Sequence, residues 1–243
     1  MQPQVQAAAL TRDMFFDFTT SPPKERNKLL LSTIVPRPIA WIVSLDLEGR
    51  LNAAPFSFFN AFAVDPPVVG VGISSNAAGE PKDTRRNIRD TKQFVVNLVS
   101  EDMAQAMNIT AIEFESDVNE LAEARLDTYP SVHISPPRIA GSPVSMECEL
   151  MQIVELGKET GLVLGRVLAL HIREDVILDA DKHHIDTPKL KLIARMHSGW
   201  YSKSSELFRM ERIPGWTGKC KSKPKLSHFH SAVRHSYRKR KKS

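Results

Sequence analysis

The stretch of residues 32–60 constrains the fold most, because an apolar strand, a tight turn and a returning strand follow one another without interruption. Residues 39–43 are continuously apolar and partly β-branched, and Asp46 to Gly49 form a turn that ends in glycine. Residues 51–54 begin the return strand. Two such runs joined by a short glycine-ended turn predict a β-hairpin, here one that leads into a loop.

A second segment, residues 82–88, brings a cation, a carboxylate and a hydroxyl together just before a predicted helix. The first N–H groups of a helix, a hydroxyl and a lysine can all donate to phosphate oxygens. The segment therefore predicts an anion site held by Lys82 and Thr84, in which Asp83 caps the helix or orients Lys82. The alternative for these three residues is a solvated helix start.

Strand-like patterns dominate the rest of the chain. We expect strands at residues 38–44, 51–56, 68–74, 93–99, 144–156, 162–173 and 176–178. Helices are expected to begin near residues 22, 83 and 100, with a short one at 118–124. Many strands with few, short helices predict a mainly β fold, a barrel with a few peripheral helices.

Charge divides the chain into two unlike parts. The net charge is +5, but residues 215–243 hold ten Lys or Arg and no acid, so residues 1–214 carry 5 − 10 = −5. We expect a lead segment at residues 1–30, one domain at 31–212 and a basic, disordered tail at 213–243. The alternative for the tail is non-specific contact with nucleic acid or an anionic surface.

Several classes of protein are disfavoured. No apolar run reaches the roughly 18 residues of a membrane-spanning helix, and the N-terminus lacks the basic start and apolar core of a secretory signal. The two cysteines, Cys148 and Cys220, lie in unlike surroundings, which predicts no disulfide framework and a cytoplasmic protein. We expect Cys148 in the core, and we expect His183 and His184 in a solvated loop rather than at a metal.

Five motifs in order and spacing resemble the flavin-reductase-like family of FMN-binding split β-barrels, the flavoredoxin type in particular. They are RPIAW at 37–41, NAAPFSFFN at 52–60, DPP at 65–67, KDTRRNI at 82–88 and FVVNLVSEDMAQAMN at 94–108. The resemblance covers about residues 12–210. It implies an FMN site in which small alanines admit the backbone close to a flat ring, while side chains such as Asn52, Ser57 and Asn60 pair with the ring's polar edge.

Carrying the family's site over position by position gives a set of expected cofactor contacts. The set is Arg37, Ile39, Ala40, Trp41, Ser44, Asn52, Ala53, Pro55, Phe56, Ser57, Asn60, Ser74, Lys82, Asp83, Thr84, Asn87 and Tyr201. The RPIAW segment is expected to contribute through its backbone, since Trp41 itself suits the core or a dimer interface better. Three roles stay open for Arg37: contact with the flavin, contact with a dinucleotide phosphate, or a salt bridge at the dimer interface. Two stay open for Ser74: contact with the ribityl chain, or a polar strand end without a ligand.

The resemblance also implies an activity. A homodimer would transfer hydride from NADH or NADPH to FMN and pass electrons to a free flavin or an acceptor protein. The cofactors carry the reactive atoms, so no catalytic side chain is expected. The alternatives are an FMN-binding electron carrier without NAD(P)H activity of its own, and a nucleic-acid-associated protein that acts through the basic tail.

Overall fold

The computed structural model describes residues 13–76 and 78–210, and the expected basic tail at 213–243 lies outside them. One large sheet contains β1 (Ala40–Leu45), β2 (Leu51–Phe56), β3 (Phe59–Val64), β4 (Pro67–Ser74), β5 (Gln93–Asn97), β8 (Val144–Leu156) and β9 (Thr160–Ile172). Its strand order is β2-β1-β5-β8-β9-β4-β3, with antiparallel neighbours throughout.

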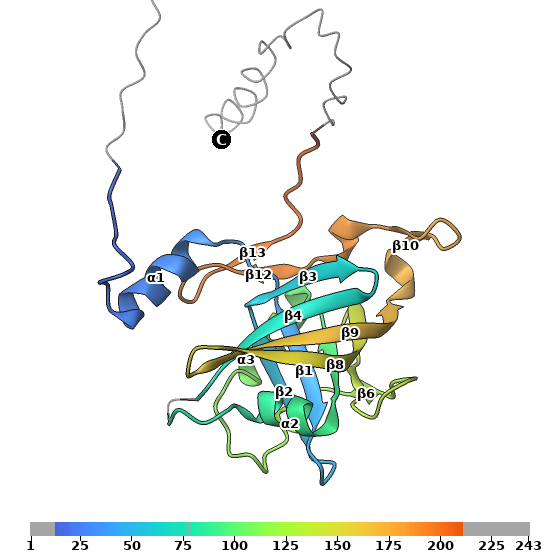
Figure 1. The fold of residues 1–243 in the computed structure, drawn as a ribbon. Helices are drawn as coiled ribbons and strands as arrows, with labels where there is room; N and C mark the ends of the chain where they lie inside the picture. The colour runs from blue at the N-terminus through green and yellow to red at the C-terminus, as the bar shows by residue number, and fades with distance from the viewer. Residues whose placement is uncertain (1–12, 77, 211–243) are drawn as a thin grey trace, which may run out of the picture. The chain divides into compact units, whose positions relative to one another are not determined.

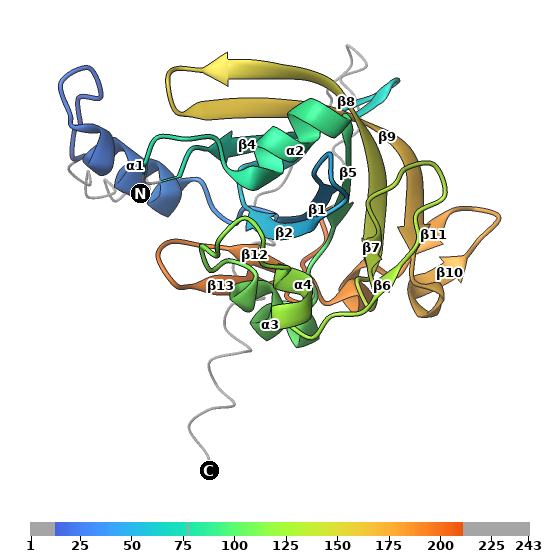
Figure 2. The same ribbon diagram turned by 90° about the horizontal axis from the view of Figure 1, so that it is seen from below.

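The sheet closes on itself, because consecutive strands occupy its two opposite edges. Only Ser57 and Phe58 separate β2 at one edge from β3 at the other. At this corner the Gly72 N–H of β4 donates to the Phe58 carbonyl at 2.8 Å. The result is the barrel seen in Figures 1 and 2, which confirms the mainly β fold.

The remaining elements surround the barrel. The helices are α1 (Pro23–Thr33), α2 (Asp83–Thr91), α3 (Ala104–Ile109) and α4 (Glu120–Glu123), with 3₁₀ turns η1 (Glu101–Met103), η2 (Glu174–Val176) and η3 (Thr187–Leu190). Three short hairpins pair β6 (Thr128–Tyr129) with β7 (Arg138–Ile139), β10 (Ile177–Asp179) with β11 (His184–Ile185), and β12 (Ile193–Arg195) with β13 (Tyr201–Lys203). No helix among the described residues has the length and apolarity needed to cross a membrane.

The predicted hairpin of β1 and β2 is present, and β1 is buried on both faces. Ala40 and Ile42 point into the barrel interior, while Trp41 and Val43 pack in a second core that includes Met107 of α3. Side chains alternate across a strand, so a continuous apolar run is what a strand covered on both sides requires. Trp41 therefore lies in the core, one of the two positions, core or dimer interface, that we expected for its side chain.

The barrel interior is filled by large side chains at close quarters. Phe94 is fully buried there beside Cys148, which confirms the core position expected for that cysteine. A Cβ at Gly165 would lie 2.4 Å from Phe94 Cζ, so β9 needs glycine where the ring crosses it. Helix α2 lies across one end of the barrel (Figure 2) and inserts Ile88 into the same core.

One strand of the large sheet was not predicted, nor were the short strands β6, β7, β11, β12 and β13. The end of the NAAPFSFFN motif was expected to be a loop, but residues from Phe59 onward form β3. The alternation of apolar and polar residues did not predict this strand, because it lies at the edge of the sheet and its apolar residues are exposed. Phe62 is 60% exposed and Val64 is 92% exposed. A half-buried strand shows apolar and polar residues in alternation, and β3 does not.

Candidate functional site

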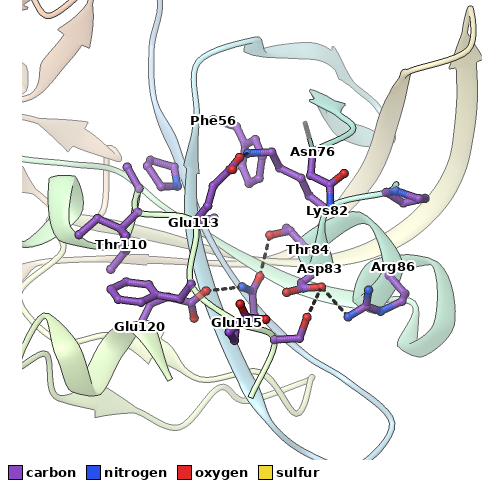
Figure 3. Close-up of a pocket in the computed structure, with 18 of the residues that line it drawn as sticks. Phe56, Asn76, Lys82, Asp83, Thr84, Arg86, Thr110, Glu113, Glu115 and Glu120 are labelled. Carbon is purple, nitrogen blue, oxygen red and sulfur yellow. Dashed lines mark hydrogen bonds and ion pairs between the residues drawn. The ribbon is translucent and has the colours of Figure 1, made fainter. Parts of the chain in front are cut away.

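A pocket of about 440 Å³ lies where β2, the start of α2 and the segment 110–116 meet (Figure 3). Its lining includes six residues expected at a cofactor, namely Asn52, Pro55, Phe56, Lys82, Asp83 and Thr84. The NAAPFSFFN and KDTRRNI motifs are separated in the chain by β3 and β4. The closure of the barrel brings them together, since α2 contacts both β1 and β2.

The start of α2 presents free hydrogen-bond donors to this pocket. The N–H groups of Arg85 and Arg86 donate to the Lys82 carbonyl, whereas those of Asp83 and Thr84 have no acceptor among the described residues. Helix-start N–H groups lack partners within the helix and lie at the positive end of its dipole. This end of α2 is therefore suited to an anion, as the sequence predicted.

The cations at this helix start are already paired with carboxylates. Lys82 Nζ lies 3.1 Å from Glu113 Oε1 on the facing segment, and Arg86 pairs with Asp83. Asp83 also accepts a hydrogen bond from Ser116 Oγ at 3.1 Å. Asp83 thus neither caps α2 through its side chain nor orients Lys82, and we correct both expectations: its carboxylate holds Arg86 and the facing segment.

The pocket is acidic as a whole. Its lining carries five carboxylates and two cations, the carboxylates being those of Glu80, Asp83, Glu113, Glu115 and Glu120. An anion that enters must compete with the Glu113 carboxylate for Lys82. Because that pair is exposed, the competition costs little.

A chain of polar side chains lies beneath the pocket (Figure 3). Glu120 Oε1 accepts from Asn52 Nδ2 at 2.7 Å, and Asn52 Oδ1 accepts from Thr84 Oγ1 at 2.7 Å. Burial raises the pKa of Glu120 above its ordinary value, hydrogen bonds from Ala53 and Asn52 oppose the shift, and the charge of Asp83 adds to it. The chain ties α4, β2 and α2 together at the pocket floor.

A second pocket of about 300 Å³ adjoins the first and shares Pro55, Phe56 and Ala111 with it. Ile39, Ser57 and Tyr201, all expected at a cofactor, line this second pocket. The Arg195 guanidinium lies 4.7 Å from the Tyr201 ring centroid and bonds the Tyr201 hydroxyl. The two pockets together offer an anion-binding end and a flatter, more apolar end.

Several expected contacts are instead wholly buried in the barrel wall. Ala40, Trp41, Ser44 and Ala53 have no exposed surface, and Asn87 is 3% exposed. They line neither pocket, so we correct their assignment from direct contacts to support. Trp41 Nε1 donates to Thr110 Oγ1 at 2.8 Å, and Asn87 Nδ2 donates to Ser44 Oγ at 3.3 Å, which fixes the residues that do reach the pocket.

Arg37 has a different role from the three that the sequence left open. Its guanidinium donates to the carbonyls of Leu31 and Ile34 at 2.8 Å each, and to the Met196 carbonyl at 2.7 Å. Those three hydrogen bonds come from both terminal nitrogens of the guanidinium, and the third nitrogen, Nε, lies 3.4 Å from Ser57 Oγ. Arg37 is 6% exposed and ties the end of α1 to the segment before β13.

Two further expected contacts lie away from both pockets. Ser74 Oγ pairs with Thr160 Oγ1 at 3.1 Å on the barrel exterior, so the polar strand-end alternative is the one observed. Asn60 lies on β3 beside two apolar hollows on the outside of the barrel. The change of direction at Ser57 and Phe58 explains this, because it separates β2 from β3.

Other residues at the pocket were missed from the sequence. Thr110, Glu113, Glu115 and Glu120 line the first pocket, and Arg195 lines the second. The first three belong to a stretch after the FVVNLVSEDMAQAMN motif for which the sequence predicts neither helix nor strand. The only available signal was its concentration of carboxylates just before a predicted short helix.

Comparison with known proteins agrees with this geometry. A family model described as a flavin reductase-like domain matches residues 31–185. An uncharacterized protein of Deinococcus radiodurans is 39% identical over 203 residues, which span 82% of this chain and 89% of the relative.

Two solved structures extend the comparison. Nitrilotriacetate monooxygenase component B from Bacillus cereus has a TM-score of 0.78 at 33% identity, covering 82% of this chain and all (100%) of that chain. The 2-nitrobenzoate 2-nitroreductase of Pseudomonas fluorescens has a TM-score of 0.76 at 30% identity, covering 84% of this chain and 98% of that chain.

Proposed function

The chain belongs to the flavin reductase-like family, and from that premise we propose that it binds FMN across the two adjoining pockets and uses it to oxidise NADH or NADPH. One observation carries the proposal. Segments far apart in the sequence, around Asn52, Lys82 and Tyr201, line two pockets that share a wall. The electrons would pass to a free flavin or to an acceptor protein.

The residues present fit this cofactor. The pocket volumes of about 440 and 300 Å³ lie in the range that small-molecule sites occupy. The donor set at the α2 start, with two free N–H groups and the Lys82 ammonium, matches an acceptor-only phosphate. The mainly apolar Pro55 and Phe56 form the wall that joins the phosphate end to the end near Tyr201.

FMN would supply the hydride-accepting ring itself. Lys82 and the α2 N–H groups would hold its phosphate, and Asn52 and Ser57 would offer hydrogen bonds along its length. Tyr201 and Arg195 would border the second pocket, which is lined in part by Ile39 and Met107. The task of these side chains is to bind and orient, so their loss affects flavin affinity before it affects the chemistry.

We also propose that the protein acts as a homodimer through the barrel face around β3. Phe58, Phe62 and Val64 are exposed on or beside this strand, at 45%, 60% and 92%. Beside it lies a hollow of about 430 Å³, lined largely by apolar residues such as Phe59, Val69 and Leu192. Exposed apolar surface on this scale marks an interaction site, and β3 is an unpaired edge.

The activity is tested by recording the visible spectrum of the purified protein with FMN and then adding NADH or NADPH separately without oxygen. The proposal expects a bound flavin spectrum that one of the two nucleotides bleaches. A bound flavin that stays oxidised with both would favour the electron-carrier alternative. Absence of flavin binding would contradict the proposed function altogether.

The dimer is tested by Val64→Glu, with Leu47→Glu as the matched control. Leu47 is also exposed, at 73%, but lies in the turn between β1 and β2. A carboxylate at position 64 would be desolvated in the interface, so we expect a monomer in analytical ultracentrifugation, while Leu47→Glu stays dimeric. A dimer in both variants would place the interface elsewhere.

A further inference from the structure

Glu120 is a buried carboxylate that the proposed function does not use. It is the first residue of α4 and is 8% exposed. One carboxylate oxygen accepts from the Ala53 N–H at 3.0 Å, and the other accepts from Asn52 Nδ2 at 2.7 Å. Its own backbone N–H contributes as well, but the three donors together do not offset burial, and the pKa of Glu120 is raised.

The direction of the hydrogen bonds beneath the pocket depends on the charge of Glu120. An ionised carboxylate only accepts, so it draws the amide nitrogen of Asn52 toward itself and leaves Oδ1 facing Thr84. Thr84 Oγ1 donates its one hydrogen to that oxygen at 2.7 Å. In this state the Thr84 hydroxyl offers only lone pairs to a ligand, and a phosphate needs donors.

A proton on Glu120 reverses the chain from Glu120 to Thr84, and the one bond given up is the long one of 3.5 Å that Ser44 Oγ donates to Asn52 Oδ1. The carboxylic acid donates to Asn52 Oδ1 once the amide has turned over, and the amide nitrogen then donates to Thr84. The Thr84 hydrogen becomes available to the pocket, while Ala53 keeps its acceptor in the second carboxyl oxygen. Protonation also removes one negative charge from a pocket that is acidic already.

We propose that Glu120 is a positioning residue that takes up a proton when a phosphate-bearing ligand binds, so that Thr84 donates to the phosphate. The inference rests on the proposed FMN function and deepens it, because it specifies how the pocket accommodates an anion. The step is a simple proton transfer from solvent to the Glu120 carboxylate. Asn52 relays its effect to Thr84.

The surrounding charges are compatible with a proton on Glu120. Burial raises the pKa of Glu120, and the nearby Asp83 carboxylate adds to that shift. No residue of β2, the strand packed against α4, is titratable. The other charged groups that line this pocket are Glu80, Lys82, Arg86, Glu113 and Glu115, and α4 itself also carries Glu123.

The variant Glu120→Gln reproduces the protonated pattern. Its amide oxygen accepts from Ala53, and its amide nitrogen donates to Asn52 Oδ1. We expect the variant to bind FMN at least about tenfold more tightly than wild type at pH 8, and the ratio of the two affinities to fall as pH is lowered, because linkage to one proton changes affinity at most tenfold per pH unit. Because both proteins bind the same ligand, the ratio of their FMN affinities is not affected by the titration of the FMN phosphate.

Riboflavin, which lacks the phosphate, is the matched ligand control. Its affinity is expected to be equal in wild type and Glu120→Gln at every pH. A ratio for FMN that does not change with pH overturns the proposal, as does an equal change for riboflavin. A wild-type protein that binds no FMN at any pH overturns the proposed function, and the proposal with it.

A measurement on wild type keeps the test independent of how the variant folds. Calorimetry of FMN binding at pH 7 in two buffers of different ionisation enthalpy gives the number of protons exchanged. Net uptake is expected in wild type and less in Thr84→Val, which lacks the hydroxyl that the proton serves. No uptake by wild type, or equal uptake by Thr84→Val, overturns the proposal.

Discussion

Two buried glutamates hold chain segments against the barrel in different ways. Glu147 of β8 is fully buried and accepts from the Val132 and His133 N–H groups at 2.7 Å each and from His171 at 2.6 Å. Burial alone would raise the pKa of Glu147, but these three donors outweigh it and hold the pKa below its ordinary value. At Glu120 beneath the pocket the donors, which are Asn52, Ala53 and the residue's own backbone N–H, do not outweigh burial, and the pKa is raised.

The difference distinguishes an anchor from a site. A buried carboxylate whose donors outweigh burial is stable as an ion and holds the segment that supplies the donors. A buried carboxylate whose donors do not outweigh burial changes its protonation state more readily, and such groups gather where ligands bind. From this comparison we expect a structural role for the region around Glu147 and a functional one for the region around Glu120.

The same substitution should destabilise the protein strongly at Glu147 and little at Glu120, and this difference is the largest effect we expect. Glu147→Gln puts an amide NH₂ where one of its three donors now points, and the buried donor left unpaired costs about 2–3 kcal/mol. Glu120→Gln gives up only the long hydrogen bond from Ser44 and removes a buried charge, so it should stay within about 1 kcal/mol of wild type. Urea unfolding measures both.

The outcome of that pair can contradict the comparison directly. Equal destabilisation by the two substitutions would make Glu120 a second anchor. The flavin affinity of Glu147→Gln serves as the control, since it should equal that of wild type wherever the variant is folded.

The anion end of the pocket region is tested by Lys82→Ala combined with Thr84→Ala. Removing a charge-assisted donor and a hydroxyl is expected to weaken FMN binding by about 2 kcal/mol, or about 30-fold. Fluorescence titration measures the affinity. Riboflavin affinity should change little, because riboflavin has no phosphate to lose.

A matched control lies at the other end of the same helix. Thr91 and Lys92 at the C-terminal end of α2 are the same residue types as Thr84 and Lys82, and they line neither pocket. Thr91→Ala combined with Lys92→Ala should leave FMN affinity unchanged. If both double variants keep wild-type affinity, the phosphate does not bind at the α2 start.

The pH dependence of stability should have opposite signs for the two glutamates. The pKa of Glu147 is lowered from 4.5 in the folded protein, so its stabilisation is complete above that value and is lost as pH falls through the folded pKa. The pKa of Glu120 is raised, so its contribution is present below 4.5 and is lost as pH rises through the folded pKa.

Unfolding free energies at a series of pH values measure this contrast. The stability deficit of Glu147→Gln should shrink on acidification below about pH 4.5. The stability of Glu120→Gln relative to wild type should rise as pH increases from the same point. Parallel curves for the two variants would remove the distinction between them.

The smallest expected effect concerns Glu113, which pairs with Lys82 across the pocket. Glu113→Gln frees Lys82 for the phosphate, and an exposed pair of this kind accounts for about two- to fivefold in affinity. FMN should therefore bind more tightly by that factor. Glu115→Gln is the matched control, because Glu115 lies on the same segment and forms no ion pair with Lys82 among the described residues. An equal gain in affinity there would be a general charge effect and would contradict the specific pairing.

Local patterns were enough to predict most of the barrel. The ranges of β2 and β8 agree with those expected from alternation and apolar runs, and α2 was recognised from its start. β3 was missed because it lies at the edge of the sheet and its apolar residues face outward. Alternation of apolar and polar residues predicts a half-buried strand, and an exposed apolar strand lacks that pattern.

Site residues were predicted correctly only where residues of suitable chemistry lie next to one another in the chain. The Lys82 and Thr84 assignment followed from donors at a helix start, and the structure puts both residues at the pocket. The role of Glu120 depends on Asn52, 68 positions away, and the role of Arg37 on Met196, 159 positions away. Contacts over such separations are set by barrel closure, which no local pattern encodes.

The central claim is that the pocket binds FMN through its phosphate at the start of α2. The most direct measurement compares the affinities of the wild-type protein for FMN and for riboflavin at the same pH and ionic strength. We predict that FMN binds at least about tenfold more tightly, the equivalent of one charge-assisted contact. Equal affinities would contradict the claim, because the phosphate would then contribute nothing to binding.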